Sequence, residues 1–167
     1  MIRDRGHEAE NIDVAYPEVQ AESLEMVMVQ GLVWLTERYK VPLLADDSGL
    51  FIDALKGFPG VYSAYVYKTI GCDGILTLME KEEARGARFE CVLGFAEPGK
   101  DPVLFKGISK GTISRSKRGD EGFGYDPIFI PEGGERTFAE VPMGEKNRVS
   151  HRGRALENFF KFIEEER

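Results

Sequence analysis

The sequence contains very little cysteine and histidine and no long apolar run. Its 167 residues include two cysteines, Cys72 and Cys91, and two histidines. So few thiols cannot build a disulfide framework, and no Cys/His cluster has the spacing of zinc ligands. The chain has no apolar stretch of membrane-spanning length, and its charged first residues, MIRDRGHEAE, lack the apolar core of a signal peptide. We therefore expect a soluble, cytoplasmic protein with no membrane partner.

The sequence also lacks an excess of positive charge. Its formal net charge is -7 and its pI is near 5.0, so its surface as a whole repels nucleic-acid polymers. The short basic run SRSKRG, residues 114–119, has no interleaved aromatic residues and does not change this expectation. A small phosphorylated ligand is still compatible with the charge, provided that a metal ion, local cations or backbone amides bind it.

A single domain is expected over residues 1–167, because 42% hydrophobic residues suffice for a core and no linker interrupts the chain. Apolar residues recur at helical spacing in residues 21–39, and Pro42 ends that pattern. Further helices are expected in residues 73–84 and from Ser150 onward. The closing helix is predicted to bury four apolar side chains, Leu156, Phe159, Phe160 and Ile163.

The strands are expected in two regions. Residues 42–55, PLLADDSGLFIDAL, predict a short buried strand, a polar turn at Asp46–Gly49 and a second strand. Residues 88–114 have the β-rich composition and the Pro-Gly punctuation of a meander. Strands and helices occur without strict βαβ alternation, so the predicted fold class is α/β with a mixed sheet.

Acidic residues that could act in chemistry occur in two stretches. A strand alternates its side chains, so Asp46 and Asp47 are expected on opposite faces unless the turn has already begun. In the alternative interpretation, both aspartates cap backbone amides in an Asx-turn. Beside a phosphate, a carboxylate would hold Mg²⁺ or take a proton from water. Glu18 and Glu22 precede the first helix and are a weak metal signal by themselves, since acidic residues there also favour the helix dipole.

Residues 119–133, GDEGFGYDPIFIPEG, combine glycines with aromatic residues. The glycines around Phe123 and Tyr125 would let the backbone approach a ligand, and an aromatic ring there offers a face for stacking a base. In the alternative interpretation, this is a glycine-rich loop before an apolar strand, with Phe123 in the core. The spacing alone does not decide between these interpretations.

Cationic and donor side chains gather at the start of the closing helix. Lys146 precedes Ser150, His151 and Arg152, and free backbone amides also point outward at a helix N-terminus. Such a group suits the oxygen acceptors of a base edge or a phosphate. In the simpler interpretation, Ser150 caps the helix while His151 and Arg152 are solvated residues of its first turn.

Taken in order, PEVQAE, ADDSG, GFPGVYSA, GFGYDPIFIPEG, TFAE and EKNRVSHRGRAL resemble the inosine-triphosphate pyrophosphatase family over nearly the whole chain. The resemblance implies a homodimer with an elongated mixed β-sheet flanked by helices, and two lobes with a nucleotide cleft between them. It also implies Mg²⁺-dependent hydrolysis of non-canonical purine nucleoside triphosphates (ITP, dITP, XTP) to the monophosphate and pyrophosphate.

Residue by residue, the resemblance assigns metal-binding, catalytic and substrate-binding functions. Glu18 and Asp47 match the family's metal carboxylates, and Asp47 also matches the residue that activates water. Phe123 matches the ring that stacks on the base. The other matched substrate contacts are Ser48, Gly124, Tyr125, Asp126, Lys146, Ser150, His151 and Arg152.

One family feature has no match in this sequence. Family members begin with a strand and a loop carrying Ser/Thr-x-Asn-x-x-Lys, which holds the triphosphate, whereas the first residues here resemble the segment after the family's first helix. We therefore expect an N-terminally incomplete domain whose chain as given is inactive or marginally stable. The competing hypothesis is a nucleotide-binding protein that keeps the base pocket and hydrolyses weakly or not at all.

Overall fold

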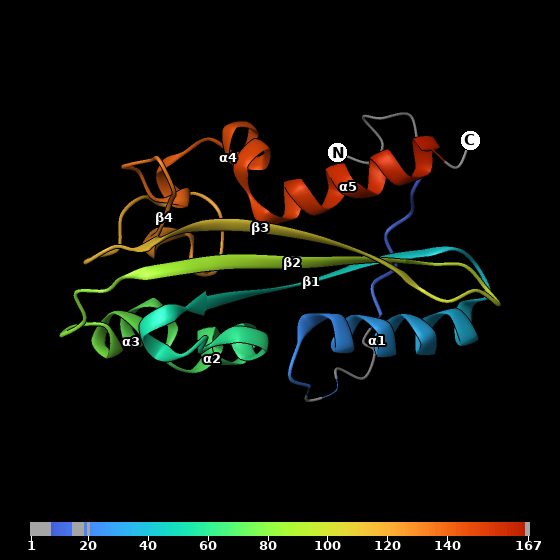
Figure 1. The fold of residues 1–167 in the computed structure, drawn as a ribbon, viewed down its shortest axis with the longest axis horizontal. Helices are drawn as coiled ribbons and strands as arrows, with labels where there is room; N and C mark the ends of the chain where they lie inside the picture. The colour runs from blue at the N-terminus through green and yellow to red at the C-terminus, as the bar shows by residue number, and fades with distance from the viewer. Residues whose placement is uncertain (1–7, 15–18, 20, 166–167) are drawn as a thin grey trace.

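The computed structural model describes residues 8–14, 19 and 21–165. Its core is a four-stranded sheet in the order β1-β2-β3-β4, with helices on both faces (Figure 1). The α/β fold with a long sheet flanked by helices is confirmed. Every pairing among the described strands is antiparallel, however, and not mixed as expected, because each strand turns back alongside the one before it. The strands are β1 (Leu43–Ile52), β2 (Gly86–Ala96), β3 (Val103–Ile113) and β4 (Phe129–Pro131).

Strand β1 corrects the prediction of two short strands separated by a polar turn. It is one strand of 10 residues that pairs with β2 without interruption, from Leu43 opposite Ala96 to Ile52 opposite Ala87. The long β2 supplies a backbone partner at every position, which outweighs the turn preference of the Asp-Asp-Ser-Gly segment. The Asx-turn interpretation of ADDSG is therefore wrong, and its two aspartates occupy successive positions of a strand.

Helices α1 (Leu24–Tyr39) and α5 (His151–Glu165) cover opposite faces of the sheet (Figure 1). Helix α1 begins where the Ser23 side chain accepts a hydrogen bond from the Met26 amide, and it ends at Lys40 in the left-handed conformation. Both helices were predicted. The α1 face buries Leu24, Met28, Leu32, Val92 and Ala96. The α5 face buries Cys91, Leu93, Phe105, Ala155, Leu156, Phe159 and Phe160, with Ile163 only partly buried.

The remaining short elements gather at the other end of the sheet, together with β4 (Figure 1). They are α2 (Ser63–Thr69), α3 (Gly71–Leu78), α4 (Met143–Val149) and the 3-10 helices η2 (Asp53–Leu55), η3 (Gly60–Tyr62), η4 (Asp126–Ile128) and η5 (Phe138–Glu140). The helix predicted for residues 73–84 thus ends early, at Leu78. Its end is bound by Arg85, whose guanidinium donates to the carbonyl oxygen of Met79 at 2.7 Å.

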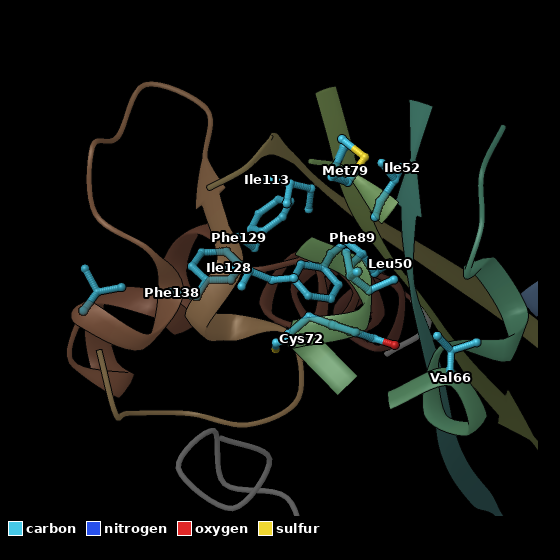
Figure 2. Close-up of a cluster of buried hydrophobic side chains, with 14 residues drawn as sticks. Leu50, Ile52, Val66, Cys72, Met79, Phe89, Ile113, Ile128, Phe129 and Phe138 are labelled. Carbon is cyan, nitrogen blue, oxygen red and sulfur yellow. The ribbon is translucent and has the colours of Figure 1, made fainter. Parts of the chain in front are cut away.

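This end of the molecule contains the largest hydrophobic cluster (Figure 2). Phe89 of β2 packs against Phe129 and Phe138, with ring centroids 4.6 and 6.1 Å away, and these two rings also contact each other. The cluster joins the sheet to the loop that precedes β4, so it fixes the loop's position over the sheet. None of the helices in the described ranges is long and apolar enough to cross a membrane.

Candidate active site

The glycine-rich loop directs its two aromatic rings to different environments. Tyr125 is buried, its hydroxyl donates to the Ser63 carbonyl oxygen at 3.1 Å, and its ring meets Tyr67 edge-on at 5.3 Å. Phe123, in contrast, is 60% exposed. The interpretation of Phe123 as a core residue is therefore wrong. The buried Tyr125 anchors the loop, and the anchored loop holds the apolar face of Phe123 toward solvent.

The Asp126 carboxylate interacts both with the backbone of this loop and with the side chain of Lys146. Its Oδ2 accepts a hydrogen bond from the Phe123 amide at 2.8 Å and forms an ion pair with Nζ of Lys146 on α4. Gly122 has φ +78°, and any Cβ there would clash with the Asp126 carboxylate. The Lys146 ammonium lies 4.6 Å from the centroid of the Phe123 ring, within the range of a cation–π contact.

The start of α5 packs directly on the sheet. Ser150 does cap the helix, since its Oγ accepts from the Gly153 amide at 3.1 Å. His151 is not solvated, because only 5% of it is exposed and its ring stacks on Phe89 with a centroid distance of 4.6 Å and an angle of 13°. Gly107 of β3 makes this approach possible, as a Cβ there would clash with the His151 carbonyl oxygen. The simple capping interpretation therefore applies to Ser150 but not to His151.

The surroundings of His151 keep its imidazole neutral. Burial, followed by the charges of Arg152 and Lys146, lowers the pKa of His151 from 6.5 to about 3. No described residue lies within hydrogen-bond distance of its buried Nδ1. A neutral imidazole has one donor and one acceptor nitrogen, so it can pair with a heterocyclic base edge without adding a third positive charge.

Arg152 completes the group around Phe123. Its guanidinium carbon lies 5.4 Å from the Phe123 ring centroid, and its Nε donates to Oδ2 of Asp46 at 2.8 Å. Burial alone would lower the pKa of Arg152, but the combined attraction of Asp46 and the acidic groups near it, Asp126 among them, outweighs burial and raises the pKa. Asp46 was not among the predicted site residues. Its partner Arg152 is 106 positions away in the sequence. The only sequence signal for Asp46 was that it is adjacent to Asp47.

Asp47 lies on the other face of β1. It is half-buried and stands opposite Val92, which packs against α1, and its Oδ1 accepts from the Ser48 amide at 2.8 Å. Ser48 stands opposite Cys91, on the α5 side of the sheet. The other predicted metal carboxylate, Glu18, lies outside the described residues. The structure thus places Asp47 apart from the side chains around Phe123, on the opposite face of one strand.

The fit of a metal at Asp47 follows from donor chemistry. Across the described ranges, no three His, Cys, Asp or Glu side chains come together as a ready-made metal site. Mg²⁺ does not need such a cage, because it binds through one or two carboxylates and completes its shell with water and phosphate oxygens. A half-buried aspartate at the sheet surface is compatible with that mode of binding.

A pocket with a volume of about 270 Å³ lies beside Lys146, one of the side chains around Phe123. It is bounded by β3, the turn after β4, and helices α4 and α5, and Lys146 is among its lining residues. Neither Phe123 nor Asp47 lines it. The predicted nucleotide cleft between two lobes stays a prediction.

Comparisons with known proteins show the family to which this chain belongs. The Ham1 family model matches residues 2–162, and the chain belongs to the Ham1 family, which confirms the predicted relationship. It is 57% identical over 148 residues to the dITP/XTP pyrophosphatase of Pyrococcus horikoshii, which covers 89% of this chain and 79% of that protein. For the dITP/XTP pyrophosphatase of Methanopyrus kandleri, the identity is 54% over 154 residues, with 92% and 82% covered.

Solved structures show the same fold. The Ham1 protein of Staphylococcus aureus superposes with a TM-score of 0.86 and 31% identity, covering 93% of this chain and 83% of that one. A nucleoside-triphosphatase described as a dITP/XTP pyrophosphatase, from Mycobacterium abscessus, gives a TM-score of 0.72 and 39% identity, with 90% and 80% covered.

Proposed function

We propose that this protein hydrolyses non-canonical purine nucleoside triphosphates, ITP, dITP and XTP, to the monophosphate and pyrophosphate. The observation that carries the proposal is the exposed ring of Phe123 with two cations beside it, Lys146 and Arg152. An exposed aromatic face with flanking donors suits a purine that stacks and presents acceptor oxygens. The relatives named dITP/XTP pyrophosphatases support the same substrate class.

Base discrimination follows from the donors at this ring. Hypoxanthine and xanthine carry an oxygen acceptor at the 6-position, which the ammonium of Lys146 or the guanidinium of Arg152 can bind. Adenine carries an amino group there and would leave these donors unpaired, which costs free energy in a desolvated site. His151, held neutral by its surroundings, adds an imidazole that can pair with the base. Ser150, Gly124, Tyr125 and Asp126 shape the wall of this proposed pocket.

Hydrolysis is assigned to the other face of β1. Asp47 would take a proton from the attacking water there, whereas Ser48, on the α5 side of the strand, would contact the substrate from the face of the base site. Mg²⁺, held by Asp47 and Glu18, would supply charge neutralisation for the triphosphate. The carboxylate of Asp47 is oriented by the Ser48 amide, which donates to its Oδ1.

The proposal includes three further properties. A homodimer is supported by exposed aromatic and aliphatic side chains on and beside η3 and α2, where Tyr62, Tyr65, Tyr67 and Ile70 are each at least 43% exposed. Residues 1–167 would act as a single domain. The cytoplasm is the proposed location, because nucleoside triphosphates are made and consumed there.

The substitution Asp47→Asn tests the function. It removes the charge with little change of shape, so we expect the melting temperature to stay near that of the wild type while turnover of ITP falls by about two orders of magnitude or more. Pyrophosphate release from ITP, XTP and ATP with Mg²⁺ is the measurement, and Asp101→Asn, in the exposed turn between β2 and β3, is the matched control.

Two results would contradict parts of this proposal. Turnover of the Asp47→Asn variant near the wild-type rate removes Asp47 from the reaction. Tight binding of ITP by the wild type without pyrophosphate release favours the competing hypothesis of a nucleotide-binding protein.

A further inference from the structure

We propose that Asp46 is a positioning residue for base recognition, which holds the Arg152 guanidinium beside Phe123 while its neighbour Asp47 serves hydrolysis. The two adjacent carboxylates of ADDSG would then have separate tasks on the two faces of one strand. The inference rests on the proposed function and deepens it, since it assigns a specificity-determining residue to the same site.

The register of the sheet separates the two carboxylates. Asp46 stands opposite Leu93, which packs in the α5 cluster, whereas Asp47 stands opposite Val92, which packs in the α1 cluster. Because successive side chains of a strand point to opposite faces, the two carboxylates cannot act on the same atoms without a break in β1. No break occurs, as β1 pairs with β2 along its whole length.

The contact between Asp46 and Arg152 orients the guanidinium, because it is made through Nε. Oδ2 of Asp46 accepts from Nε, and no described residue receives a hydrogen bond from the terminal amino groups of Arg152. A guanidinium has five N–H donors in a rigid fork, so a carboxylate at Nε fixes the plane while the terminal amino groups stay available for a ligand. The same guanidinium lies 5.4 Å from the Phe123 ring, where a stacked purine would present its edge.

The Asp46 carboxylate also accepts a hydrogen bond from the Cys91 thiol. The Cys91 thiol is fully buried, and its Sγ lies 3.8 Å from Oδ2 of Asp46. Burial raises the pKa of Cys91 to about 12, so the group stays a neutral thiol that can donate to the carboxylate. The carboxylate thus lies between a neutral donor in the core and a cation at the ligand site.

If this ion pair served only to stabilise the fold, its removal would lower the melting temperature. The Asp46 and Arg152 side chains are 33% and 40% exposed, and ion pairs in contact with water contribute little to stability. Removing the charge of Asp46 should therefore hardly change the melting temperature. Its consequence should be a less ordered guanidinium and a weaker distinction between 6-oxo and 6-amino purines.

The test is Asp46→Asn, measured with ITP and ATP at saturating Mg²⁺. We expect KM for ITP to rise about tenfold with kcat within about threefold of the wild type, and the ITP-to-ATP ratio of kcat/KM to fall about tenfold. Arg152→Ala should lower the same ratio. In the Asp46→Asn, Arg152→Ala double variant, the two effects should not add, because both remove one interaction.

Asp53→Asn is the matched control, because Asp53 also pairs with an arginine, Arg88 at 3.5 Å, just beyond the far end of β1. An unchanged ITP-to-ATP ratio in Asp46→Asn, additive effects in the double variant, or a loss confined to kcat would each overturn the assignment. Calorimetric binding of ITP to the wild type and to Asp46→Asn distinguishes this failure from failure of the proposed function. If the wild type releases no pyrophosphate, weaker ITP binding by the variant still supports the positioning role, and equal binding overturns it.

Discussion

Among the residues that the structure describes, two carboxylates are buried with cationic partners, and their surroundings differ. Asp126 is 2% exposed, and its partner Lys146 is also buried, between the rings of Phe123 and Phe138. Glu90 on β2 is 6% exposed. It binds Arg88 Nε and Lys106 Nζ, both at 2.6 Å, and both cations reach solvent. One pair is shielded from water beside the proposed base site, and the other is the inner end of a surface network.

The difference indicates what each carboxylate does. Lys106 also binds Glu25 in the first turn of α1, at 2.8 Å, so the Glu90 network ties the sheet to that helix. A fully buried pair gains little net stability over apolar residues, because both charges lose their hydration. The Asp126–Lys146 pair is therefore better explained by its position, since it fixes a cation and a loop at the ring of Phe123.

The largest expected effect comes from breaking the shielded pair. Asp126→Ala leaves the Lys146 ammonium buried without a partner and the Phe123 amide without its acceptor, which should destabilise the fold by about 3–5 kcal/mol. ITP binding should be lost as well. Urea unfolding followed by circular dichroism measures the first effect, with Glu135→Ala on the exposed turn after β4 as the control. A loss below about 1 kcal/mol would show that Lys146 finds water or another partner.

Breaking the network at Glu90 should have a smaller effect. Glu90→Gln keeps the shape and removes the charge, and its two cations can return to water, so we expect a loss of about 1–3 kcal/mol. Turnover of ITP by the folded variant should stay near that of the wild type. Glu25→Gln, which removes only the outer and half-exposed member, should cost less than about 1 kcal/mol. Equal losses for the two variants would mean that burial of Glu90 has no energetic weight.

The smallest expected effect is that of mild acid on the free energy of unfolding, through His151 in the shielded region. The pKa of His151, beside Lys146 and Arg152, is lowered to about 3 from 6.5, so the unfolded chain binds a proton there that the folded chain does not. Its contribution to stability is complete above pH 6.5 and is lost as the pH falls toward 3. Between pH 7 and pH 6 the loss should be below about 1 kcal/mol.

The control for this pH dependence is His151→Phe, which keeps a flat ring over Phe89 and cannot titrate. Subtracting its unfolding curve from that of the wild type at each pH isolates the histidine. The Glu90→Gln variant should retain the wild-type dependence, because Glu90 belongs to the other region. A wild type and a His151→Phe variant with the same pH dependence would contradict the burial of this ring.

Local pattern alone determined several features of this protein. Helical spacing located α1, whose period and cap are local properties, and the hairpin of β2 and β3 followed from composition and turn residues. The motifs also identified the family and the residue types around the proposed base. Five of them, Phe123, Asp126, Lys146, His151 and Arg152, do come together.

Only the tertiary structure decided how those residues are used. The ADDSG segment is a strand because β2 pairs with every residue of it, and that partner is far away in the sequence. His151 is buried because Gly107 lets α5 lie against the sheet, and Asp46 meets Arg152 across 106 positions. Local preferences extend over a few residues, whereas burial and pairing depend on which distant segments fold onto one another, so the division between Asp46 and Asp47 exists only in the folded protein.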